Sequence, residues 1–183
     1  MTLSYIVLEG NKNQEILEKL LPKNLIQDVK IVVGDSQYEV RSLASSLIAT
    51  RHIPVILILD ANTDNESQIF QKTDLINYLL RRAAAKTPFQ VSLAIPEIEI
   101  IFLQNKSLIE KIAQREFNDL EWQLAQSKPK EFLETVLGKE QSINEKIFSN
   151  INDEEIKILQ QHPLIQEIMI FLSSLNVSSV AIN

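Results

Sequence analysis

The segment VILILDANTD, from Val55 to Asp64, constrains the fold more than any other part of the chain. Its apolar run is too short for a free-standing helix and too apolar for an exposed strand. We therefore predict a parallel strand that is covered on both faces. The run stops abruptly at Asp60 and Asn62, and in open α/β sheets ligands bind beyond the carboxyl ends of the strands. We expect any chemistry of this chain to centre on Asp60.

Short apolar runs alternate with helical patterns through the first half of the chain. The strand-like runs are Tyr5–Leu8, Val29–Val33, the run that begins at Val55, and Phe89–Ile95. Between them, apolar residues recur at helical spacing around Ile16–Leu21, over Ser36–Arg51 and over Glu66–Lys86. Strands that alternate with helices favour a parallel sheet with right-handed crossovers. We predict an α/β fold with a parallel sheet of about four strands flanked by helices.

The second half of the chain has a different character. Lys106–Gln126 and Pro129–Leu137 are helical patterns, and no further convincing strand precedes the tail. We therefore predict an α/β domain over residues 1–104 and a helical C-terminal extension over residues 105–183. The apolar stripe of Leu164–Leu175 is expected to pack on the sheet domain or on a second subunit. The tail Val177–Ile182 is assigned as a short edge strand.

Composition narrows the class of protein. The apolar content of 45% supports a sizeable core, and the net charge of −6 disfavours tight nucleic-acid binding by bulk electrostatics alone. The chain has no cysteine, which excludes disulfides and thiolate metal sites. The N-terminus lacks the pattern of a signal peptide, and no apolar run approaches the length of a membrane span. We expect a soluble, cytoplasmic protein that does not enter membranes.

Acidic side chains follow three of the predicted strands. Glu9 follows the first strand, Asp60 and Asp64 follow the third, and Glu97 or Glu99 follows the fourth. If the first and third strands are neighbours, these ends converge at one edge of the sheet. Carboxylates gathered without histidine or cysteine suit Mg²⁺ or Mn²⁺ better than zinc. The pattern predicts a site for a divalent cation, with one carboxylate acting as a general base.

The same residues resemble a known family. A strand that ends in Glu9-Gly10, followed by a strand that ends in Asp60-Ala61-Asn62-Thr63-Asp64, resembles the Toprim domain of topoisomerases, bacterial primases and OLD-family nucleases. The resemblance covers about residues 4–103. It implies a Rossmann-like fold, a role for Glu9 as general acid, general base or metal ligand, and Mg²⁺ binding by Asp60. OLD-type members also have an acid after the next strand, which Glu97 or Glu99 matches.

The resemblance implies a nuclease that holds Mg²⁺ or Mn²⁺ and acts on DNA or RNA. The metal ligands would be Asp60, Asp64, Glu99, Glu97 and Asn62, and the catalytic residues would be Glu9 and Asp60. OLD-type Toprim domains are usually fused to an ATPase. This chain has no Walker A motif, so a partner ATPase is a further expectation, as is a homo-oligomer formed through the C-terminal helices.

Alternatives to this interpretation start from the departures from the family pattern. Asn62 replaces the second aspartate of the pair, and Asn11 or Asn13 stands where an acid often follows the Glu-Gly turn. Amide oxygens bring no negative charge, so the chain could be a non-catalytic scaffold that acts through protein partners. A receiver-like signalling domain phosphorylated on Asp60 is weaker, because the acidic pair after the first strand is missing.

Each acid also has a purely structural explanation. Asp60 and Asp64 suit turns and helix N-caps, as in many strand-to-helix connections. Glu97 and Glu99 suit a charged first helical turn, which the helix dipole favours. Glu9 suits a solvent-facing position in a Glu-Gly turn.

Overall fold

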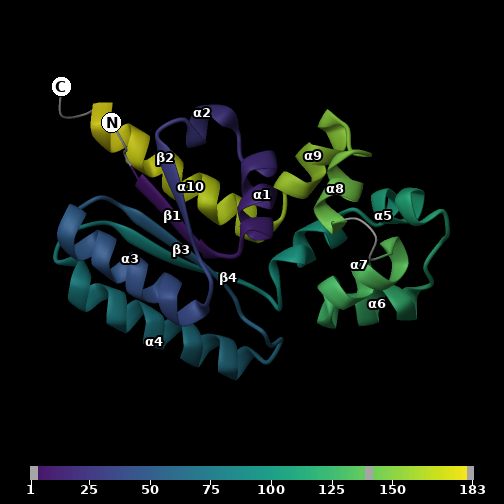
Figure 1. Ribbon diagram of the computed structural model, residues 1–183, viewed down its shortest axis with the longest axis horizontal. Coiled ribbons are helices and arrows are strands. Elements are labelled where there is room, and N and C mark those ends of the chain that lie inside the picture. The colour runs from purple at the N-terminus through teal and green to yellow at the C-terminus, as the bar shows by residue number, and fades with distance from the viewer. Residues whose placement is uncertain (1–3, 139–141, 181–183) are drawn as a thin grey trace.

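The computed structural model describes residues 4–138 and 142–180 and contains one four-stranded sheet with helices on both faces (Figure 1). The elements are β1 (Ser4–Glu9), α1 (Asn11–Leu20), α2 (Lys23–Ile26), β2 (Val29–Gly34), α3 (Gln37–Arg51), β3 (Val55–Asp60), α4 (Glu66–Ala84), β4 (Phe89–Ala94), the 3₁₀ helix η1 (Ile98–Gln104), α5 (Lys106–Ala113), α6 (Asp119–Ser127), α7 (Pro129–Leu137), α8 (Ile143–Phe148), α9 (Asp153–Gln160) and α10 (Pro163–Val180). The predicted α/β class is confirmed. The short α2 and the 3₁₀ helix η1 were not expected from the sequence.

The sheet is parallel throughout, with the strand order β2-β1-β3-β4. In β1, Ile6 pairs with Ile31 of β2 on one side and with Ile56 of β3 on the other. β1 and β3 are therefore neighbours, as the convergence of the acids requires. The chain adds β2 on one side of β1, and it adds β3 and β4 on the other side. The sheet therefore has a switch point between β1 and β3, and crevices form beyond the strand ends at such points.

The two faces of the sheet have separate cores, because successive side chains of a strand point in opposite directions. Ile56 and Ile58 belong to a core that includes α1, η1 and helices of the C-terminal half. Leu57 and Leu59 belong to the second core, which α3 and α4 cover. Figure 1 shows α3 and α4 on one face of the sheet and α1 and α10 on the other. Both faces of β3 are covered, which explains its unbroken apolar run.

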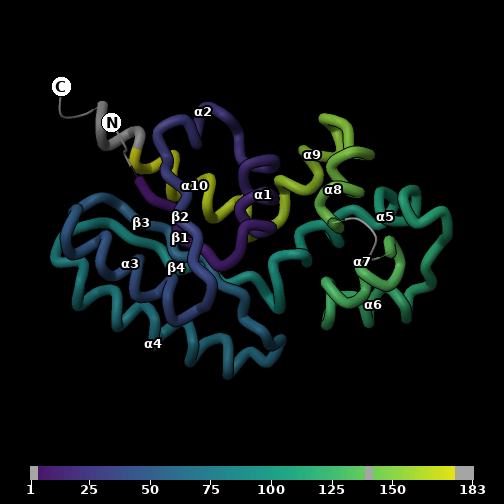
Figure 2. Tube along the Cα trace, viewed as in Figure 1, coloured from purple at the N-terminus to yellow at the C-terminus, as the bar shows by residue number. Residues whose placement is uncertain are grey.

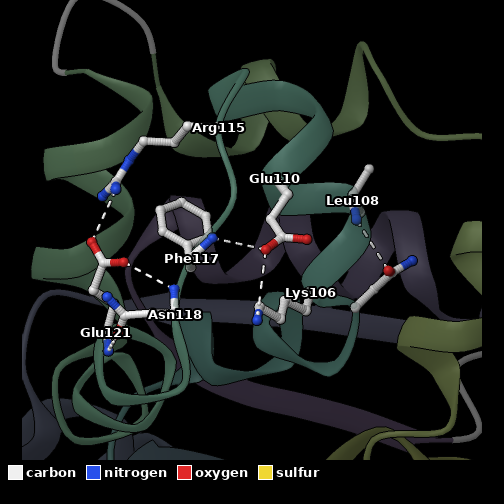
Figure 3. A network of polar contacts seen from close by, with 8 residues as sticks. Lys106, Leu108, Glu110, Arg115, Phe117, Asn118 and Glu121 are labelled. Atoms are coloured by element: carbon white, nitrogen blue, oxygen red, sulfur yellow. Dashed lines mark hydrogen bonds and ion pairs between the residues drawn. The ribbon is translucent and has the colours of Figure 1, made fainter.

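The helical pattern predicted over Lys106–Gln126 forms two helices, α5 and α6. The chain leaves α5 through Gln114, whose φ of 55° is left-handed. The Glu110 side chain then accepts a hydrogen bond from the backbone N–H of Phe117 at 2.8 Å. A capping box between Asn118 and Glu121 starts α6 (Figure 3). The amphipathic pattern continues across this break, so periodicity alone did not reveal it.

The C-terminal helices pack on the sheet domain. The Ser92 hydroxyl of β4 donates to the Glu167 carboxylate of α10 at 3.3 Å, and the Gln160 amide donates to the Leu20 carbonyl of α1 at 2.7 Å. In Figure 2 the trace of α10 returns along the sheet after α9. One apolar core joins residues of both ranges, from Ile6 to Leu172.

The edge strand predicted for Val177–Ile182 is wrong over 177–180, because α10 continues through Val180. No glycine or proline interrupts the chain after Pro163, so the helix extends past the strongly apolar stretch. Residues 181 and 182 lie outside the described residues. No helix within residues 4–138 and 142–180 has the length and apolarity needed to cross a membrane.

Candidate functional site

Backbone hydrogen bonds bring the ends of the strands together. The Gly10 N–H donates to the Gly34 carbonyl at 3.1 Å, which joins the turns after β1 and β2. The Ala61 N–H donates to the Ala94 carbonyl at 2.8 Å, and the Asn62 N–H donates to the Pro96 carbonyl at 2.8 Å. The chain after β3 therefore runs beside the chain after β4, which brings Asp60 near Glu97 and Glu99.

A cavity of about 580 Å³ lies at this edge of the sheet. Its walls include the carboxylates of Glu9, Asp60, Glu97 and Glu99. The side chains of Asn62, Lys12 and Lys130 also line it, together with Asn11, Asn13 and Gln37. We call this cavity the acidic pocket. It unites four of the acids that the sequence singled out.

Asp60 is fixed from two directions. Its Oδ1 accepts a hydrogen bond from the backbone N–H of Ile98 at 2.9 Å. Its backbone carbonyl accepts hydrogen bonds from Lys72 Nζ at 2.6 Å and from Gln37 Nε2 at 3.0 Å. These contacts from η1, α4 and α3 hold Asp60 at the carboxyl end of β3, where its carboxylate lines the acidic pocket. The helix-cap explanation for Asp60 does not apply, because the Asn65 side chain caps α4 by accepting from the Gln68 N–H.

The electrostatics of the pocket disfavour a full set of negative charges. Burial, followed by the nearby Glu99 carboxylate, raises the pKa of Asp60 to about 7, while the hydrogen bond from Ile98 opposes the rise. Glu97 and Glu9 add smaller repulsions. Burial also raises the pKa of Glu99, whose residue is only 8% exposed. Perturbed carboxyl groups in a cleft are typical of functional sites, because a ligand or a proton must compensate their charge.

The C-terminal extension forms one wall of the acidic pocket. The backbone N–H of Lys130, in the first turn of α7, donates to Glu97 Oε2 at 3.3 Å. The buried Asn144 of α8 contacts the α1 side of the pocket: it donates to the Lys12 carbonyl at 2.8 Å and to Glu15 Oε2 at 2.9 Å. The α/β half alone therefore does not complete the pocket.

Asp64 and Asn62, two of the predicted metal ligands, differ in their position relative to the acidic pocket. Asp64 is exposed and is not among the residues that line the acidic pocket. Asn62 lines it and has a left-handed φ of 57°, a conformation that asparagine tolerates better than most residues. The amide at position 62 therefore has a local structural explanation.

The donor types of the pocket fit a hard divalent cation, since they are carboxylates and amides without histidine or cysteine. The arrangement of the side chains is more open than a finished metal centre. Across residues 4–138 and 142–180, no three His, Cys, Asp or Glu side chains stand close enough together to hold a metal ion. Coordination of one cation by three of these acids would therefore require a rotamer change, whereas one or two carboxylates with water ligands also suffice for Mg²⁺.

Comparisons of the chain with family models, curated proteins and solved structures gave no match. The assignment of a function therefore rests on the acidic pocket itself.

Sequence reasoning missed four residues of this site, one of which is Lys12 of α1, which lines the pocket. Lys72 and Gln37 hold the Asp60 carbonyl, and Lys130 lines the pocket from a helix that follows Glu99 by about thirty residues. Each lies on the polar side of an amphipathic helix, where a solvated position was the simpler interpretation. Only the Pro129 at the start of α7 indicated a helix N-terminus there.

Proposed function

We propose that the chain is a Toprim-like protein whose acidic pocket binds Mg²⁺ or Mn²⁺ and hydrolyses a nucleic-acid phosphodiester. The observation that supports the proposal is the gathering of Glu9, Asp60, Glu97 and Glu99 in one pocket, where the pKa of Asp60 is raised to about 7. Uncompensated carboxylates of this kind favour a cation.

Asp60 and Glu99 would hold the cation, because both are largely buried and face the same cavity. Glu97 or Glu9, both half-buried, would complete the set after a change of rotamer, and Asn62 offers an amide oxygen. A bound divalent ion polarises a phosphoryl oxygen and stabilises the charge that develops on it.

The residues of the chain itself supply the remaining steps. Glu9 would accept a proton from the attacking water, whose oxygen bonds to phosphorus as the bond to the leaving ester oxygen breaks. Lys12 and Lys130, which line the same pocket, would offset the charge of the non-bridging oxygens.

Calorimetric titration with MnCl₂ and cleavage of end-labelled DNA and RNA test the proposal. Asp60→Asn, which retains an acceptor for Ile98, is expected to lose cation binding and cleavage while it keeps the fold. The matched control is Asp74→Asn, an exposed aspartate of α4 outside the pocket. Asp64→Asn tests whether Asp64, which the sequence predicts as a metal ligand, binds the cation although it does not line the acidic pocket. A wild-type protein that neither binds Mn²⁺ nor cleaves any nucleic acid contradicts the proposal.

A second candidate is a non-catalytic scaffold. The amide at Asn62 favours this candidate. So does the spacing of the acids, because no three of them within residues 4–138 and 142–180 stand close enough together to hold a metal ion. Its partner would be an ATPase or a second copy of the chain, and the exposed Ile170 of α10 is a candidate contact. Micromolar to millimolar Mn²⁺ binding that Asp60→Asn abolishes would contradict this candidate.

A further inference from the structure

A groove between α3 and α4 has a chemistry unlike that of the acidic pocket. It encloses about 280 Å³ and is lined on the α3 side by Tyr38, Arg41, Ser42 and Ser45. Its other wall is apolar and comes from Ile76, Leu79 and Leu80 of α4. The groove therefore combines an aromatic ring, a guanidinium group and two hydroxyls on one wall with an apolar surface on the other.

We propose that this groove binds single-stranded nucleic acid and leads the strand into the acidic pocket, an inference that rests on the proposed function. Tyr38 stacks on a base, and Arg41, with Ser42 and Ser45, binds the backbone phosphates. Aromatic stacking combined with basic phosphate contacts is how proteins bind single strands without reading their sequence.

The groove and the acidic pocket are continuous along the chain. Gln37 lines the acidic pocket, and its neighbour Tyr38 lines the groove. Arg41 lines the groove and its Nε donates to the Gln37 carbonyl at 3.1 Å, so the guanidinium group contacts a residue that also lines the acidic pocket. Figure 1 shows α3 and α4 side by side on one face of the sheet. Because both helices follow parallel strands, both begin at the edge of the sheet that holds the acids.

The charge of this layer differs from that of the whole molecule. α3 and α4 together contain five basic and three acidic residues, whereas the chain has 18 basic and 24 acidic residues. No carboxylate within residues 4–138 or 142–180 forms an ion pair with Arg41. The positive layer attracts a polyanion toward a site whose own carboxylates would repel it.

The exposed ring favours a single strand over a duplex. Tyr38 is 75% exposed, and an exposed aromatic side chain beside a guanidinium group offers a stacking surface. Tyr78 of α4 is 57% exposed and has Arg82 at 5.9 Å from its ring centroid, which repeats the combination on the same layer. A duplex hides the faces of its bases in the stack, so these rings have access only to unpaired bases.

Fluorescence anisotropy with a labelled oligothymidylate tests the inference in EDTA, so that the reading does not depend on a cation in the acidic pocket. Tyr38→Ala and Arg41→Ala are each expected to weaken binding about tenfold. The controls are Arg51→Ala, at the other end of α3, and Leu120→Ala, an exposed residue of α6 in the C-terminal half. Both should bind within about twofold of wild type, and a hairpin duplex should bind more weakly than the single strand.

The salt dependence adds a readout that a folding defect would not produce. Loss of one phosphate contact in Arg41→Ala should reduce the slope of log K against log [salt] by about 0.7. Tyr38→Ala should leave the slope unchanged, because stacking releases no counterions. Identical slopes for Arg41→Ala and wild type would contradict the phosphate contact.

The remaining outcomes separate this inference from the proposed function. Groove-dependent binding by a protein that neither binds Mn²⁺ nor cleaves nucleic acid would support the groove and overturn the hydrolase. A protein that cleaves nucleic acid, but whose groove variants and control variants bind oligothymidylate equally well, would overturn the groove inference and leave the proposed function intact. A change in the sedimentation coefficient of Tyr38→Ala, without a change in oligothymidylate binding, would overturn it in favour of a contact between copies of the chain.

Discussion

The carboxylate of Asp60 accepts a hydrogen bond from the backbone N–H of Ile98 at 2.9 Å, across 38 residues of sequence. This contact joins the end of β3 to the first residue of η1. The carboxylate lines the same cavity as the buried Glu99, whose charge, after burial itself, helps to raise the Asp60 pKa. One hydrogen bond therefore both joins two segments of the pocket and offsets part of the electrostatic cost of burying the Asp60 charge.

The raised pKa of Asp60 predicts that the pocket destabilises the fold at neutral and alkaline pH. The folded pKa, about 7, lies above the unfolded value near 3.9, so the native state binds the extra proton. The contribution of Asp60 to the free energy of unfolding therefore falls as the pH rises from about 4 to about 7. Asp60→Asn should be more stable than wild type at about pH 8 by on the order of 2 to 4 kcal/mol.

Urea unfolding of both proteins at several pH values measures this difference. The stabilisation should shrink as the pH falls toward about 4 and vanish below that value, where the wild-type carboxyl is protonated in both states. A difference that stays constant with pH would show that charge burial is not its cause.

Cation binding should release protons below neutral pH. A cation held by Asp60 must displace the proton that the carboxyl binds when its pKa is about 7. We expect release of about one proton at about pH 6 and of few at about pH 8. Titration of MnCl₂ in two buffers of different ionisation enthalpy measures the number, and Mn²⁺ binding without proton release at the lower pH would exclude Asp60 as a ligand.

Gly34 is predicted to be intolerant of a side chain. A Cβ there would lie 2.8 Å from Cγ1 of Val40, a fully buried β-branched residue with little rotamer freedom. Gly34→Ala should reduce the free energy of unfolding by about 1 to 3 kcal/mol. Val40→Ala removes the clashing methyl groups, so Gly34→Ala should cost less in that background, as a double-mutant cycle measures.

Gly10 provides the contrasting case. Its φ of +80° strains any other residue, yet a Cβ would have no atom within 4 Å. Gly10→Ala should therefore be destabilising through backbone conformation, by about 1 to 3 kcal/mol, and Val40→Ala should not relieve it. Relief of both glycine variants by Val40→Ala would contradict the steric explanation for Gly34.

Asn144 is predicted to stabilise the wall of the acidic pocket that includes Lys12. The residue is 3% exposed, and its amide donates to the Lys12 carbonyl and the Glu15 carboxylate. Asn144→Ala leaves these acceptors without that donor and should cost about 1 to 3 kcal/mol. Asn150→Ala, which removes an exposed amide bonded to the Lys146 carbonyl, is the control and should change stability by about 0.5 kcal/mol or less. Equal costs in thermal unfolding would contradict the prediction.

Local patterns were sufficient for much of the fold. Ser36 caps α3 by accepting the Glu39 N–H, and the β3 run is buried on both faces, as a parallel strand requires. The C-terminal tail was assigned wrongly as a strand because short apolar runs fit either structure. α10 instead extends through Val180.

The sequence by itself determined the alternation of strands and helices and placed Glu9, Asp60 and the Glu97–Glu99 pair at strand ends, since period, turn residues and chain polarity are local properties. Only the tertiary structure decided the rest. It brought Lys130 of the C-terminal half to the pocket, left Asp64 outside it and buried Glu99 near Asp60. Burial and charge repulsion depend on neighbours that are distant in the sequence, and no pattern within one segment contains that information.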